Sequence, residues 1–298
     1  MAITAATVTG DFSGFLQADR ADAIFERAAQ MSVVQALGRR VPLGISGVEV
    51  PVVTTKPTAG WVAEGGTKPA TKGTMSLKTM TPKKLAAIAV VSAEVVRANP
   101  GNYVDLFRNE IAEAFAIAFD AAALHGTSTP FTTYIDQTTK TRELGTAAAS
   151  AGGVYGDLVA AMKLLTDDSK RLSGFAFDSR AEPVLLASVD TAGRPLFIDT
   201  PVTDTVLNQG RVLGRPAFIG DGVYGAGDST VGYAGDWTQV AWGTVGGISY
   251  DVSTEATVTI NGALTSLWEK NLVAIRAEAE YGFLCNDTAA FVQLLDAA

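Results

Sequence analysis

The stretch SLWEKNLVAIRAEAEYGFL, residues 266–284, decides which fold the sequence predicts. From Asn271 to Phe283, one set of alternate positions is mostly apolar, whereas the other set carries Arg276, Glu278 and Glu280. A helix would scatter both sets around its axis, so the period of two predicts one long β-strand. Residues 288–295 then predict a short final strand or turn.

A long helix is predicted upstream of this strand. Apolar side chains recur at steps of three and four from Val104 to Ala122, Asn102 is a suitable N-cap, and Gly126 ends the pattern. From Tyr103 to His125 such a helix would measure about 35 Å. That length suits a strut.

The segment from 44 to 92 predicts β-structure with an exposed tip. Residues 48–53 alternate as a strand, and residues 74–80 return with Met75 and Leu77 on one face. A loop rich in Gly, Thr and Lys joins them, and residues 85–91 predict a further apolar strand. An isolated two-stranded hairpin is only marginally stable in water, so we expect this excursion to lie against another subunit.

The remaining residues predict a smaller amphipathic helix and a compact α/β lobe. The helix covers residues 19–37, as one or two pieces, and follows a short polar arm. Residues 127–153 predict a loop. The lobe covers residues 154–255, with helices at 154–172 and 181–189, a turn at 214–216, and strands at 175–177, 231–234, 239–242 and 248–252.

The composition predicts a chain that is covered by neighbours. The 298 residues carry a net charge of −8, and only 18% are charged while 47% are hydrophobic. The mean hydropathy is +0.21, yet the longest run without Asp, Glu, Lys or Arg, residues 121–135, is too short to span a membrane. Assembly with other subunits best explains this apolar surface. The pI of about 4.8 argues against sequence-independent nucleic-acid binding.

The sequence offers little catalytic chemistry. Its single cysteine, Cys285, excludes an intrachain disulfide, and its single histidine, His125, excludes a two-histidine metal site. We therefore expect no metal and no cofactor. His125 ends the long predicted helix, where a cation favours the helix dipole, and no GxSxG elbow supports a catalytic role, because residues 44–47 have the wrong spacing.

Taken in order, several stretches resemble the major capsid protein of tailed bacteriophages, which has the Hong Kong 97 fold. They are GWVAEGGTKP, KKLAAIAVVSAEVV, FDAAALHG, LGRPAFI, GDW at 235–237, and SLWEKNLVAIRAEAEYGFLCNDTAAFVQL. The resemblance implies an α+β fold in five segments. These are an N-terminal arm at 1–44, an extended loop at 45–91, a peripheral domain with a spine helix at 92–149, an axial domain at 150–262, and the returning long strand of the peripheral domain at 263–298.

The resemblance also implies partners and a location. Members of this family form hexamers and pentamers that close an icosahedral shell around double-stranded DNA, which an acidic chain would enclose without sequence-specific contacts. The shell forms in the host bacterial cytoplasm and is part of the virion, with a portal and in some cases a decoration protein. Only about 18 residues precede the first predicted helix, which implies a separate scaffolding protein or a processed chain, and Met1 favours the separate scaffold.

The resemblance suggests residues for contacts between subunits and for a covalent cross-link. The contact residues would be Trp61, Glu64, Lys68, Lys72, Met75 and Leu77. In one branch of the family a loop lysine attacks an asparagine of a neighbour with the help of a glutamate. Lys68 or Lys72, Asn271 and Glu278 are candidates for these roles. On a regular strand Asn271 and Glu278 would lie on opposite faces, so they could act together only across subunits.

Two other interpretations stay open at this point. An encapsulin-type compartment uses the same fold to enclose a protein cargo. A small α/β hydrolase would instead place His125 in an active site and would be a monomer.

Overall fold

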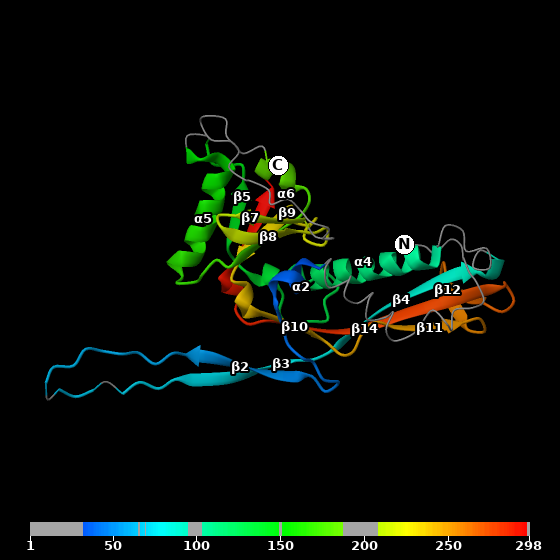
Figure 1. Ribbon diagram of the computed structural model, residues 1–298, viewed down its shortest axis with the longest axis horizontal. Coiled ribbons are helices and arrows are strands. Elements are labelled where there is room, and N and C mark those ends of the chain that lie inside the picture. Colours follow the sequence, from blue (N-terminus) through cyan, green and yellow to red (C-terminus); the bar gives the residue numbers. More distant parts are fainter. Residues whose placement is uncertain are drawn as a thin grey trace.

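Strand β14, Leu272–Cys285, is the centre of a five-stranded sheet (Figure 1). It pairs antiparallel with β4, Lys83–Ser92, from Leu272↔Ser92 to Tyr281↔Lys83. β11, Ser249–Ser253, and β10, Val240–Thr244, also pair antiparallel with β14, and β1, Arg39–Arg40, adds a short parallel edge to β10. The predicted long strand is confirmed, with the apolar positions of its alternation buried.

This computed structural model describes residues 32–64, 66–68, 70–94, 103–148, 151–186 and 208–296. The predicted helix at 19–37 lies mostly outside them, and its described part is α2, Val33–Leu37. The proposed N-cap Asn102 also lies outside the described residues.

Helix α4, Tyr103–Leu124, lies along the five-stranded sheet as the predicted strut (Figure 1). Its apolar stripe buries Ile111, Phe115 and Phe119, and the ring centroid of Phe119 lies 5.0 Å from that of Tyr281 in β14. Gly126 has φ +68° just beyond the helix, and a Cβ there would come within 2.8 Å of the Tyr134 ring. A left-handed, crowded position of this kind requires glycine, which explains why the helix ends here.

A second sheet has six strands, and helix α5 packs on it. Its core buries Leu158 and Leu165 of the helix against the stacked rings of Phe175 and Phe177. The strand order is β5 (Thr141–Leu144), β15 (Phe291–Asp296), β9 (Thr230–Gly235), β6 (Gly174–Phe177), β8 (Arg215–Ile219) and β7 (Asn208–Val212); the helices of this part are α5 (Gly153–Asp167) and α6 (Ala181–Leu186).

Membership of the two sheets does not follow the order of the sequence. β10 and β11 lie within the predicted lobe, but they pair with β14. β5 and β15 lie outside that lobe, but they complete the six-stranded sheet. The chain therefore crosses between the two sheets several times.

Some local predictions need correction. Residues 127–153 include β5 and the short 3-10 helix Ile135–Gln137, and α5 ends at Asp167, not at residue 172. The turn predicted at 214–216 lies at Leu213 and Gly214, both with positive φ, so Pro216 belongs to β8. Two short strands not predicted, β12 (Thr257–Ile260) and β13 (Ala263–Ser266), pair with each other before β14.

Strands β2, Val48–Thr55, and β3, Thr74–Met80, form a hairpin that extends away from both sheets (Figure 1). At its base Met80 packs in a small cluster with Leu43 and Leu284. A Cβ on Gly282 would lie 2.7 Å from Leu43 Cδ2 and 2.9 Å from Met80 Cγ, so the glycine allows the hairpin base to lie directly on β14. Because β4 pairs with β14, the free excursion ends at Met80, although the resemblance placed residues up to 91 in the loop.

The carboxylate of Asp120 fastens α2 to α4. It is fully buried and accepts hydrogen bonds from Ser32 Oγ at 2.6 Å, Val33 N at 2.8 Å and Val34 N at 3.2 Å. Burial raises the pKa of Asp120 to about 7, although these hydrogen bonds oppose the rise. The folded chain therefore holds a proton here at pH values where an unfolded aspartate has released it.

This proton predicts a specific pH dependence of stability. Between about pH 4 and pH 7 the folded state binds more protons at Asp120 than the unfolded state, so this group's contribution to the free energy of unfolding falls as the pH rises, by about 4 kcal/mol at most. Asp120→Asn removes the titration and keeps an acceptor for the backbone amides. We expect denaturant unfolding at pH 5 and pH 8 to show a smaller pH effect in the variant. Equal pH effects in both proteins would contradict the assignment.

Candidate interaction surface

The hairpin β2–β3 has one apolar face that points away from the body. The register places Pro51 opposite Leu77 and Val53 opposite Met75, so these four side chains share a face. Leu77 is 63% exposed, Met75 67% and Val53 53%. The opposite face carries Val48 and Val50, which pack near Met80. The sequence alternation thus leaves one apolar face without a partner among the described residues.

Among the described residues, the loop that joins the two strands carries the most exposed large apolar side chain. Trp61 is fully exposed, and Glu64, Lys68 and Lys72 on the same loop are exposed as well. A hairpin tip cannot shield an indole by itself. All six predicted contact residues lie exposed on this hairpin, which is the candidate interaction surface.

A backbone contact and one lysine hold the hairpin base. Lys78 lies on the face of the hairpin turned toward the body, and its Nζ donates to the carbonyl oxygen of Asn286 at 2.7 Å. Val41 N donates to the carbonyl oxygen of Trp242 at 2.7 Å and fixes the chain that leads into β2. These contacts set where the hairpin leaves the body, whereas its outer half has no comparable contacts among the described residues.

The structure separates the residues proposed for a cross-link. The loop with Lys68 and Lys72 lies at one end of the longest axis, and the start of β14 lies at the other (Figure 1). Asn271 is exposed and has φ +51°, so it belongs to a turn before β14 and not to the regular strand assumed from the sequence. A single chain therefore cannot bring a loop lysine to Asn271.

The third cross-link candidate, Glu278, is already engaged within the chain. Its carboxylate accepts from Lys84 Nζ at 3.0 Å, and Arg276 Nε lies 3.4 Å away. Arg276 in turn pairs with Asp251 at 2.6 Å, which raises the pKa of its guanidinium. Glu278 is part of a surface ion-pair network across three paired strands.

His125 is part of a hydrogen-bond network with Asp136, Tyr233 and Val223. Its Nδ1 lies 2.9 Å from Asp136 Oδ2 and 2.9 Å from the hydroxyl of Tyr233, and its Nε2 lies 2.9 Å from the carbonyl oxygen of Val223. The Tyr233 hydroxyl donates to Asp136 Oδ1 at 2.6 Å. Burial and the charge of Asp136 raise the pKa of Tyr233 well above its usual value, so the phenol remains a donor. The network joins α4 to the six-stranded sheet.

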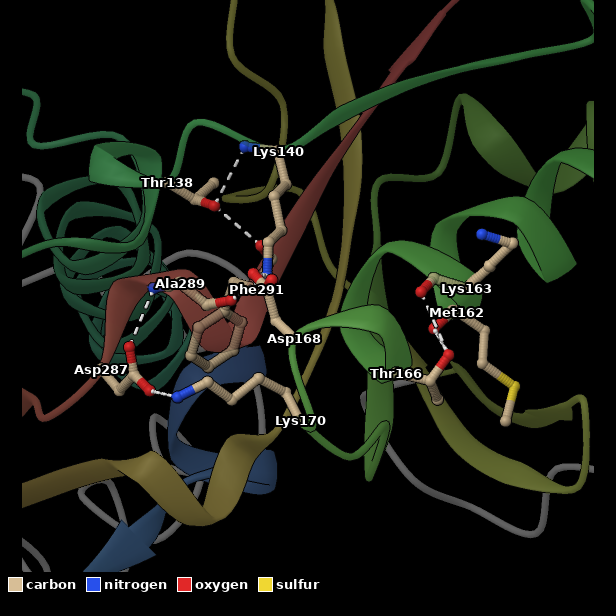
Figure 2. Close-up of polar contacts among 10 residues, drawn as sticks. All are labelled: Thr138, Lys140, Met162, Lys163, Thr166, Asp168, Lys170, Asp287, Ala289 and Phe291. Carbon is tan, nitrogen blue, oxygen red and sulfur yellow. Dashed lines mark hydrogen bonds and ion pairs between the residues drawn. The ribbon is translucent and has the colours of Figure 1, made fainter. Parts of the chain in front are cut away.

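One ion pair and one hydrogen bond join the segment that follows β14 to the lobe that carries α5 (Figure 2). Lys140 Nζ pairs with Asp168 Oδ2 at 2.6 Å and donates to the carbonyl oxygen of Ala289 at 2.6 Å. Lys170 pairs with Asp287. No sequence pattern indicated these partners. Lys140 and Ala289, and Lys170 and Asp287, lie more than a hundred residues apart, and Lys140 and Asp168 belong to different segments of the lobe.

The described residues contain no cluster of metal-ligating side chains. Over that part of the chain, no group of three or more His, Cys, Asp or Glu residues is placed to hold a metal ion. No helix among the described residues is long and apolar enough to cross a membrane. Cys285 is buried, and burial raises the pKa of its thiol to about 12. The sheltered thiol acts as a small apolar side chain.

Comparison with known proteins agrees with this geometry. A family model described as "Phage capsid family" matches residues 13–295. The chain is 42% identical over 295 residues to the probable major capsid protein gp17 of Mycobacterium phage D29, covering 96% of this chain and 92% of the relative. It is 43% identical over 300 residues to the protein of the same description from Mycobacterium phage L5, covering 96% and 91%.

Solved structures show the same arrangement. A chain from Gordonia phage Cozz superposes with a TM-score of 0.70 at 26% sequence identity, covering 90% of this chain and 87% of that one. The match of the family model to nearly the whole sequence, together with relatives identical at more than four positions in ten, shows that this chain belongs to the phage capsid family.

Proposed function

We propose that copies of this chain assemble into hexamers and pentamers, which close an icosahedral shell around double-stranded phage DNA. Membership of the phage capsid family makes the chain a major capsid protein, a structural component of the virion shell. The observation that supports the mode of assembly is the hairpin, whose outer apolar face and Trp61 have no partner within the described chain. A neighbouring copy is the simplest partner for such a surface.

We propose that the parts of the structure take the domain roles that the resemblance implied, with bounds that follow sheet pairing and not the sequence segments. We assign the five-stranded sheet and α4 to the peripheral domain, and the six-stranded sheet with α5 and α6 to the axial domain. The hairpin β2–β3 is the extended loop. The N-terminal arm lies mostly outside the described residues. These assignments follow the pairing of strands within each sheet. They do not follow continuous segments of the sequence, because each sheet is built from strands that lie far apart in the chain.

The charge of the chain fits a container for DNA. A net charge of −8 repels phosphate groups on average, so the shell would enclose DNA without gripping it. A scaffolding protein, a portal and a decoration protein are the further partners we propose, with assembly in the host bacterial cytoplasm. Purified particles that contain a protein cargo in place of DNA would favour the encapsulin-type alternative.

The exposed hairpin face generates the first test of assembly. Met75→Ser with Leu77→Ser removes apolar area that a neighbour would bury, at about 1.5–3 kcal/mol per fully buried side chain. We expect the variant to need at least about tenfold more protein to form particles in negative-stain microscopy and sedimentation. Both side chains are exposed in the single chain, so the unfolding midpoint should stay unchanged.

Thr79→Ser is the matched control, because Thr79 is exposed in the same strand and the change keeps a hydroxyl. The control should assemble like the unchanged chain. If the double variant also does so, the hairpin face is not an assembly surface.

We further propose a covalent step between assembled subunits. The Nζ of Lys68 or Lys72 on one subunit attacks Cγ of Asn271 on a neighbour, an amide bond forms, and ammonia leaves. Glu278 accepts the lysine proton and supplies it to the leaving group. The exposure of both lysines and of Asn271 supports this step, whereas the ion pairs of Glu278 with Lys84 and Arg276 require that its carboxylate exchange a partner.

Denaturing electrophoresis tests the covalent step. Assembled particles boiled in detergent and reductant should give a ladder at multiples of 31 kDa, and Asn271→Ala should collapse it to one band. Lys68→Arg and Lys72→Arg, each made alone, would identify the attacking lysine because arginine keeps the charge but is not nucleophilic. A single band from the unchanged chain would rule out the cross-link without affecting the proposed shell.

A further inference from the structure

A cleft of about 410 Å³ opens between α4, the start of β4 and the loop that follows α4. Its wall is mainly apolar, and the lining includes Phe119, Phe131 and Tyr281 together with small side chains of α4. Lys83 and Lys84 lie on the β4 side of this cleft. Lys84 is paired with Glu278, whereas Lys83 is exposed. The cleft therefore combines aromatic walls with positive charge at its edge.

The segment around Trp61 complements this cleft. Trp61 is the most exposed large apolar side chain among the described residues, and Glu64 follows it on the same loop. Large aromatic side chains seated in concave pockets dominate the binding energy of many protein interfaces. An indole against Phe119 and Phe131, with a carboxylate near Lys83, would satisfy both the apolar and the charged features of the cleft.

The loop cannot reach the cleft of its own chain. The cleft begins at Lys83, three residues after the hairpin base at Met80. Trp61 lies thirteen residues beyond Val48, so the extended hairpin carries it about 40 Å from that base. Figure 1 shows the hairpin pointing away from α4 and β4. A different copy must supply the occupant.

We propose that Trp61 of one copy inserts into the Phe119–Phe131 cleft of a neighbouring copy, with Glu64 of the incoming loop beside Lys83. This inference rests on the proposed assembly of identical subunits, and it adds the two surfaces that meet. The contact is heterologous, because the donor surface and the acceptor surface lie on different parts of each chain. Such contacts generate rings when the rotation between copies closes.

Photo-crosslinking tests the contact directly. Trp61→p-benzoylphenylalanine keeps an aromatic side chain, and after irradiation of assembled particles mass spectrometry locates the residues that it joins. We expect adducts between two copies at residues 83–85 or 118–131. Trp268→p-benzoylphenylalanine is the matched control, because Trp268 is also strongly exposed but lies just before β14, whose start is at the opposite end of the molecule from the hairpin loop. Adducts of residue 61 elsewhere in particles that form normally would overturn the docking contact and leave the proposed shell intact.

A second pair of variants tests the Phe119–Phe131 cleft itself, in case the photoreactive side chain hinders assembly. Ala118 is exposed and lines the cleft, so Ala118→Leu should obstruct it and raise the protein concentration needed for particles by about tenfold. Ala114 is exposed on the same helix one turn earlier and does not line the cleft, so Ala114→Leu should assemble normally. Equal assembly of both variants would contradict the proposal.

Charge reversal separates docking from general effects on folding. Glu64→Lys alone and Lys83→Glu alone should each weaken assembly, and the two together should restore it. Failure of the double variant to recover, with both single variants folded, would show that these residues do not meet. If the unchanged chain forms no particles under any condition, the proposed function itself fails, which is a separate outcome.

Discussion

The pairing of β14 with β4 is the constraint on which the rest of the structure depends. Ten consecutive residue pairs join the two strands, and β10 and β11 add to the same central strand. The resulting sheet supports α4 through the contact of Phe119 with Tyr281. The close approach at Gly282 then seats the hairpin base on β14. Removing this strand would leave the helix, the hairpin and the sheet without a common support.

The sequence predicted those elements whose pattern is long and regular. The alternation in β14 and the three-and-four spacing in α4 extend over enough residues to exclude other periods. β5 was missed because four residues with two charges show no period, and it forms because β15 and the Asp157 carboxylate hold it. Asp157 pairs with Arg142 and accepts from Gly145 N at 2.8 Å and Ala147 N at 3.2 Å. Such tertiary contacts leave no local signal.

The candidate interaction surface was predictable because its residues follow a regular strand period. The buried polar networks follow no such period and were not predicted. Met75 and Leu77 alternate with polar neighbours, so their shared face follows from the strand period, and the structure leaves that face exposed. By contrast, Asp136 and Tyr233 meet His125 only after two distant segments fold together. Asp120 is likewise an isolated carboxylate in the sequence, and its partners on α2 lie 86–88 residues away.

Polar and apolar contacts are distributed differently in the body of the chain and in the hairpin β2–β3. Buried polar groups such as Asp120 and His125 join elements within the body, where leaving any partner unpaired is costly. The hairpin has the opposite character: it is held at its base by Met80 and Lys78, and its outer apolar face meets no described residue. A hairpin fixed only at its base takes its final orientation from whatever covers that face. The partner of the hairpin face therefore lies outside the described part of the chain, whereas the partners of Asp120 and His125 lie within it.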